Sequence, residues 1–212
     1  MSDQLINQLV EDLSPRKPMK NSLAWGLAIC AFIGLSAFVI LSHGLRADFA
    51  KAVGNGTIAW KNGGLILGAL ASLIGTIELS RPDTRPRRIM PGLFIAIFAI
   101  ITWRFLELKT HSPLLFELSH INFGGAQTCL SIISIGGIGI FGILWYFWLR
   151  KAASKHPQYL GAIAGLMSAL IAGSAYSFHC NMDNIFYYLT CYWLPAFGLS
   201  GLGFLLGSRL RW

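Results

Sequence analysis

Six stretches of this 212-residue chain are each long and apolar enough to cross a lipid bilayer as a helix. A membrane-spanning helix needs about 20 apolar residues, and the stretches cover residues 23–41, 63–79, 89–106, 124–149, 160–178 and 185–206. Charged residues make up only 12% of the chain, about half their share in a soluble domain. The sequence therefore predicts an all-α membrane protein, a bundle of six transmembrane helices. Soluble enzymes and direct nucleic-acid binding are excluded.

Lys and Arg residues are distributed unequally between the two sides of the predicted bundle. Twelve of the seventeen lie before the first stretch, between the second and third, between the fourth and fifth, or after the sixth. Because basic residues are enriched in cytoplasmic loops, both termini are predicted to be cytoplasmic. The chain then divides into a cytoplasmic N-terminal segment (1–22), a transmembrane domain (23–208) and a short cytoplasmic tail (209–212). The first stretch lacks a small-residue cleavage site, so it is expected to remain as an anchor.

Small residues recur at every fourth position of the fifth and sixth stretches. A stripe of this kind allows two helices to approach closely. It consists of Gly161, Gly165, Ala169 and Gly173 in the fifth stretch and of Gly203 and Gly207 in the sixth. Pro195, in the middle of the sixth stretch, predicts a kink there.

Ionisable side chains are expected to be absent from the middle of the predicted spans. Glu78 and Arg104 lie at span ends, whereas transporters and proton relays usually carry charged groups near the bilayer centre. This argues against the main alternative, a small membrane transporter or channel component for a metal ion or an apolar solute. A structural subunit that binds a partner through packing is a further alternative. Because the motifs HExxH and GxSxG are also absent, we do not expect an enzyme.

Three of the four cysteines are predicted to share the outer leaflet. Cys180 follows the fifth stretch, which runs outward, and Cys129 and Cys191 lie about 8 Å below the outer surface on spans that run inward. Cys30 lies near the inner side and is expected to pack as a small hydrophobe. On the oxidising side of a bacterial inner membrane, disulfide or thiol-sensor chemistry is favoured at Cys129 and Cys180.

Two chemistries are open to this pair. The thiols could form a disulfide if their Cα atoms come within about 7 Å. Alternatively, the thiolates could bind a soft or borderline metal ion together with nearby donors such as Met182. No cofactor is required beyond such transient metal binding at Cys129 and Cys180. The candidate sensor residues are thus Cys129 and Cys180, with His179, Asp183 and Cys191 as candidate auxiliary residues.

The N-terminal segment carries a helical amphipathic pattern. Apolar residues at positions 5, 6, 9, 10 and 13 fall on one helical face, and Ser14-Pro15 ends the pattern. The polar side is acidic, so the helix suits a protein groove better than anionic lipid. An alternative is that this helix lies against the cytoplasmic ends of the bundle.

Several motifs along the chain together resemble the NrsF family of bacterial six-span membrane anti-sigma factors. They are the opening Leu5-Ile6-x-x-Leu9-x-x-Asp12-Leu13-x-Pro15, the lone cysteine early in the fourth span, His179-Cys180 followed by an acidic residue, and the closing Gly203-x-x-x-Gly207-x-Arg209-Leu210-Arg211-Trp212. They cover the whole chain, in order and at matching spacing. The sequence departs from the family pattern at Asn181, where a proline is expected.

The resemblance implies a multi-pass protein of the bacterial inner membrane that takes part in transcription regulation and stress response. It would sequester an extracytoplasmic-function sigma factor and release it on heavy-metal or oxidative stress. The family's sensing cysteines correspond to Cys129 and Cys180. The expected partners are this sigma factor and membrane lipid. We expect sigma binding on the cytoplasmic face, in the loop of residues 81–88 and chiefly at Leu5, Ile6, Leu9, Asp12 and Leu13.

Overall fold

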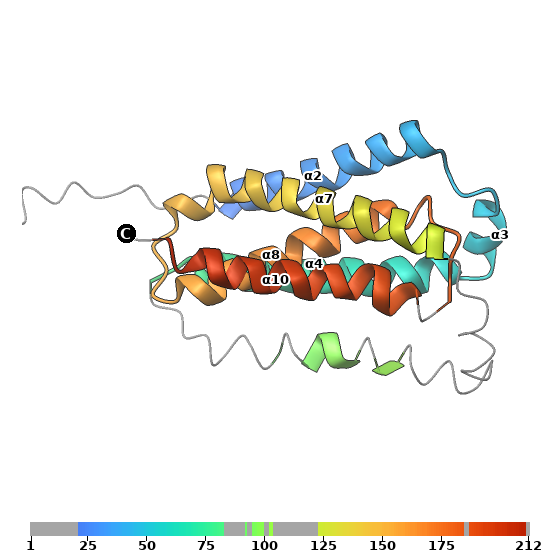
Figure 1. The fold of residues 1–212 in the computed structure, drawn as a ribbon. Coiled ribbons are helices and arrows are strands. Elements are labelled where there is room, and N and C mark those ends of the chain that lie inside the picture. Colours follow the sequence, from blue (N-terminus) through green and yellow to red (C-terminus); the bar gives the residue numbers. More distant parts are fainter. Residues whose placement is uncertain are drawn as a thin grey trace, which may run out of the picture.

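The computed structural model describes residues 21–82, 92, 95–99, 102–103, 123–184 and 187–210, and these residues include helices but no strand. The helices are α2 (Asn21–His43), α3 (Phe49–Gly54), α4 (Thr57–Leu79), α7 (Phe123–Phe147), the short 3-10 helix η1 (Leu149–Lys151), α8 (Pro157–Tyr176), the π-helix η2 (Tyr188–Trp193) and α10 (Leu194–Gly207). Figure 1 shows the long helices side by side along one axis.

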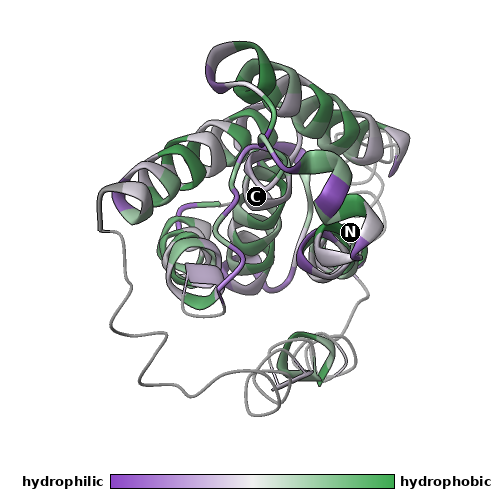
Figure 2. Ribbon diagram, turned by 90° about the vertical axis from the view of Figure 1, so that its right-hand side faces the viewer, coloured by the Kyte–Doolittle hydropathy of each residue, from purple (hydrophilic) through white to green (hydrophobic). Residues whose placement is uncertain are grey.

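Helix α8 occupies the centre of the bundle and contacts α2, α4, α7 and α10 (Figures 1 and 2). Nearly all of its side chains are buried, whereas the surrounding helices expose large apolar side chains such as Ile33, Ile135 and Leu205. An outer surface of this kind matches lipid rather than water. Five helical segments are long and apolar enough to cross a membrane: Asn21–His43, Thr57–Leu79, Gly125–Lys151, Pro157–Tyr176 and Tyr188–Gly207. The chain is therefore a multi-pass membrane protein.

Five of the six predicted spans correspond to these helices. The third, residues 89–106, lies mostly outside the described residues, although its described positions are helical. A sixth span therefore stays a prediction, as does the division into three segments. The start of α2 and the end of α10 lie at the same end of the bundle (Figure 1). That this end faces the cytoplasm also remains a prediction.

Glycines bring α8 and α10 into backbone contact. A Cβ atom added at Gly161 would overlap the carbonyl oxygen of Gly203, and one added at Gly165 would overlap that of Leu199. A Cβ atom at Gly207 would likewise overlap the backbone at the start of α8. The close packing predicted from these small residues is thus confirmed.

The sixth predicted span consists of two helix types. Residues Tyr188–Trp193 form a π-helix, and α10 begins at Leu194 with Pro195 in its first turn. The proline tolerates this position because the first turn of a helix leaves its N–H groups without helical partners. Where the sequence predicts a kink at Pro195, the structure changes from π- to α-helix. Short π-helical segments often occur at functional sites, and this one carries Cys191.

Candidate functional site

Three cysteines meet at the end of the bundle where α8 ends and η2 begins. The sulfur atoms of Cys129 and Cys180 are 3.5 Å apart, and both residues are buried. Cys191 lies next to Cys129, and its Sγ lies 3.7 Å from the carbonyl oxygen of Ala126 in α7. All of these thiols are free. The structure thus brings together the candidate sensor cysteines, which are separated by about fifty residues of sequence.

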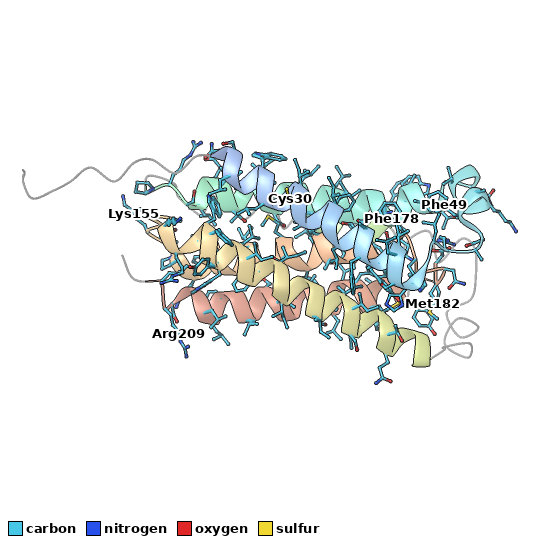
Figure 3. The ribbon with its side chains drawn as sticks, turned by 90° about the horizontal axis from the view of Figure 1, so that it is seen from above. Cys30, Phe49, Lys155, Phe178, Met182 and Arg209 are labelled. Atoms are coloured by element: carbon cyan, nitrogen blue, oxygen red, sulfur yellow. The ribbon has the colours of Figure 1, made fainter. Side chains whose placement is uncertain are left out.

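Local structure directs the two thiols toward each other. In the stretch 125–132 of α7, Cys129 is the one buried residue. Helix α8 ends at Tyr176, and the N–H groups of His179 and Cys180 both donate to its carbonyl oxygen, at 3.0 and 3.2 Å. This turn directs the chain back across the end of α8 and places Cys180 beside α7. Figure 3 shows Phe178 and Met182, which flank the turn, at the end of the bundle opposite Lys155 and Arg209.

Arg46, which follows α2, is buried beside this turn. Its Nε and Nη2 donate to Asp48 at 2.7 and 2.8 Å, and its Nη1 and Nη2 donate to Asp183 at 3.1 and 2.7 Å. Nη1 also donates to the carbonyl oxygen of Cys180 at 3.4 Å. A guanidinium has five N–H donors, so this set of contacts uses all of them.

Lys61, in α4, is the second buried cation, with a side chain only 2% exposed. Its Nζ donates to the carbonyl oxygens of Cys180 and Met182, at 3.0 and 2.9 Å, and to Asp183 Oδ1 at 3.3 Å. Nζ also lies 5.3 Å from the centre of the Tyr192 ring, which belongs to η2. An ammonium group has three N–H donors, and all three act on residues 180–183.

The charges of this cluster balance, with two cations against the carboxylates of Asp48 and Asp183. Hydrogen bonds to these two carboxylates raise the pKa of Arg46, and Arg46 in turn lowers the pKa of Asp48. The pKa of Cys180 is raised, first by its hydrogen bond with Cys129 and then by burial, against the opposing effect of Lys61. The hydrogen bond with Cys129 and burial therefore favour the neutral thiol form of Cys180.

The candidate auxiliary residues differ in where they lie. Asp183 binds Arg46 and Lys61. His179 Nδ1 is 2.9 Å from the carbonyl oxygen of Gly44, and its ring contacts the rings of His43 and Tyr176. Among the described residues, no group of three or more His, Cys, Asp or Glu side chains is arranged to hold a metal ion. Of the auxiliary residues, only Cys191 adjoins the thiol pair.

Sequence reasoning missed the buried cations. Lys61 was predicted to lie outside the second span, but α4 begins at Thr57 rather than at residue 63, so Lys61 lies in the first turns of the helix and is buried. Asn55-Gly56 was the available signal: such a pair marks a turn, and Gly56 has a φ of 73° directly before the helix. The expectation for Cys30 is also wrong, since this residue is exposed on α2 (Figure 3).

A family described as negative regulator of sigma F, NrsF, matches residues 9–212. The chain belongs to this family. The match includes Cys129, Cys180 and the buried cations, and it gives the protein a regulatory, anti-sigma role with a sigma factor as partner. Comparisons with curated proteins and with solved structures gave no match. The predicted sigma-binding residues Leu5, Ile6, Leu9, Asp12 and Leu13 lie outside the described residues.

Proposed function

We propose that this NrsF protein holds an extracytoplasmic-function sigma factor at the bacterial inner membrane and releases it when Cys129 and Cys180 react with an oxidant or a heavy metal. The observation that carries the proposal is the 3.5 Å contact between the two buried sulfur atoms. Two free thiols at this distance can become a disulfide with a small movement. They can also both bind one soft metal ion as thiolates.

Oxidation by a hydroperoxide would proceed in two steps. One thiolate attacks the peroxide oxygen, the O–O bond breaks, and an alcohol or water leaves while the sulfur becomes a sulfenic acid. The second thiol then attacks the sulfur of the sulfenic acid. The hydroxyl group of the sulfenic acid takes the proton of this thiol and leaves as water. Two electrons pass from the two sulfurs to the peroxide, and one S–S bond forms.

Metal binding would follow a different course. Both thiols would lose their protons, because the thiolate is the form that binds a metal. The pair would then carry two negative charges against the ion. Nearby Lys61 does not bind metal, but its positive charge favours the thiolate of Cys180.

Sigma binding would take place at the opposite end of the bundle. The basic side chains Lys155 and Arg209 mark this end (Figure 3), and basic residues favour the cytoplasmic side. The amphipathic residues Leu5, Ile6, Leu9, Asp12 and Leu13, with the loop of residues 81–88, would form the contact. The signal would therefore travel the length of the helices, from the thiols to the sigma factor.

The sensing role is tested by transcription from a promoter that depends on the partner sigma factor. Cells carrying Cys129→Ser or Cys180→Ser should lose induction by hydrogen peroxide or by cadmium ion, and Cys30→Ser is the matched control because Cys30 is exposed and distant. Retained induction in the Cys129 and Cys180 variants would reject the sensing role. Alkylation mapping by mass spectrometry separates the two chemistries, since a disulfide needs a reductant to reopen and a bound metal needs only a chelator.

Sigma binding is tested by copurifying the full-length protein with the sigma factor. Leu9→Asp and Leu13→Asp place charge on the apolar face and should abolish copurification. Gln8→Asp carries the same charge on the polar face and should leave it unchanged. If all three variants retain the sigma factor, the N-terminal helix is not the binding surface.

A further inference from the structure

We infer that Lys61 is a positioning residue that fixes Cys180 in place, so that a reaction of the thiol pair displaces Cys129 and the adjoining end of α7. The inference rests on the proposed sensing function and names the part of the structure that moves. It states which of the two cysteines moves when the pair reacts.

Lys61 anchors the backbone on both sides of Cys180. Its three hydrogen bonds go to the carbonyl oxygens of Cys180 and Met182 and to the carboxylate of Asp183. A movement of the segment 180–183 would break contacts of a buried ammonium ion. Lys61 is 1% exposed, and a buried charge that loses its partners is highly unfavourable.

Arg46 holds the same segment from a second direction. It comes from the chain after α2, whereas Lys61 comes from α4, and both donate to the carbonyl oxygen of Cys180. In addition, the N–H of Arg46 donates to the carbonyl oxygen of Phe178 at 3.2 Å. Two cations and one backbone bond thus connect the Cys180 turn to α4 and to the loop before α3.

The α7 side of the pair carries Cys129, whose described contacts involve no charged side chain. Between positions 125 and 132, Cys129 is buried and the other residues are exposed or half-buried. A disulfide has an S–S distance of about 2.05 Å, so the sulfurs must close by about 1.5 Å from their present 3.5 Å. Cys180 is anchored by two buried cations, whereas the contacts of Cys129 are with neutral groups, the thiols of Cys180 and Cys191. Because neutral contacts are weaker than hydrogen bonds to buried charges, Cys129 should move.

The experiment measures amide hydrogen exchange of the full-length protein in detergent, before and after oxidation by hydrogen peroxide. Oxidation takes two electrons from the thiols and forms one S–S bond, and the peroxide is reduced to two molecules of water. In the parent protein, exchange should change in the first turns of α7 and stay the same in residues 180–183. In Lys61→Met, which removes the three bonds but keeps an unbranched side chain one atom shorter, residues 180–183 should lose protection on oxidation.

Lys51→Met is the matched control, since Lys51 is an exposed lysine at the same end of the bundle. It should behave as the parent protein does. Lys61→Arg retains the charge and donors and should restore the parent pattern in part, a rescue that a loss of packing alone would not produce. If Lys61→Met does not fold, Asp183→Asn provides the same test, because it removes the carboxylate that Lys61 and Arg46 share.

The inference is overturned if oxidation of the parent protein changes exchange in residues 180–183 and not in α7. It is also overturned if the folded Lys61→Met protein shows the parent pattern. Neither result depends on the sigma factor, which is absent from the measurement. A failure of the proposed sensing function would appear instead in the transcription assay with the cysteine variants.

Discussion

Replacing Gly203 with alanine tests the contact between α8 and α10. A Cβ atom at this position would lie 2.8 Å from the carbonyl carbon of Gly161, whereas ordinary contact begins at 3.4 Å. The carbonyl oxygen of Gly161 would lie closer still, so the two helices would have to separate by more than 0.6 Å at this point. Overpacking of this kind costs about 1–3 kcal/mol.

Gly198→Ala is the matched control, because Gly198 lies on the same helix with nothing within 4 Å of its added Cβ atom. It reports the gain in helix propensity, which is up to about 1 kcal/mol. The free energy of unfolding of Gly203→Ala should therefore lie below that of Gly198→Ala by about 1–3 kcal/mol, roughly a 5- to 150-fold difference in the ratio of folded to unfolded protein.

The assay follows unfolding in mixed micelles as the fraction of dodecyl sulfate increases, with the fluorescence of the seven tryptophans as the signal. Trp148 and Trp193 are fully buried and should report the loss of packing. Equal unfolding midpoints for the two alanine variants would refute the reasoning, because the backbone contact would then carry no steric constraint.

Three further predictions concern the end of the bundle that holds the thiols. The rate of alkylation of Cys180 should still rise above pH 9, since the pKa of this thiol is raised and the thiolate is the reactive form. A plateau of the rate near pH 8.5, the ordinary pKa of a thiol, would contradict this. Gly56→Ala should lower the free energy of unfolding by about 1–2 kcal/mol, because Gly56 has a φ of 73° and the left-handed region is unfavourable for alanine. Gly54→Ala is the control and should not lower it. Equal effects of the two changes would contradict this reasoning. Asn62→Leu removes one of two acceptors of the Ser177 hydroxyl, the other being the carbonyl oxygen of Ser174, and should cost about 1 kcal/mol. A double variant with Ser177→Ala should cost less than the sum of the two single changes, and strict additivity would argue against the bond.

The sequence predicts the helices well because a bilayer permits few structures. Each backbone N–H and C=O must be satisfied within the span, so an apolar run becomes a helix. The run predicted at residues 160–178 corresponds to the observed helix α8, Pro157–Tyr176. The close packing of α8 with α10 was also predictable, because the small residues repeat at helical spacing. Such a repeat is visible within a single stretch of sequence.

The charged cluster was not predictable in the same way. Arg46 and Asp183 are separated by 137 positions and Lys61 and Asp183 by 122, so no local pattern connects them. The sequence placed Lys61 just outside a span, where it would be an ordinary solvent-exposed lysine. Only the fold shows that three separate segments bring their charges to one buried point. The π-helix at Cys191 has no local signature either.

The way the helices contact one another favours α7 as the route for the proposed signal. Helices α8 and α10 interlock through backbone atoms at Gly161 and Gly203, so they should move as one body. The nearest atoms facing Gly136 and Gly137 of α7 are instead side-chain methyl groups of Leu35 and Leu199, and the backbone of Ala169 lies farther from Gly137, at 3.3 Å from an added Cβ atom. Helix α7 is 25 residues long, and at about 1.5 Å per residue it extends from the thiol pair to η1, with its basic residues Arg150 and Lys151. The proposed displacement of Cys129 would therefore have a continuous helix, α7, along which to reach the opposite end of the bundle.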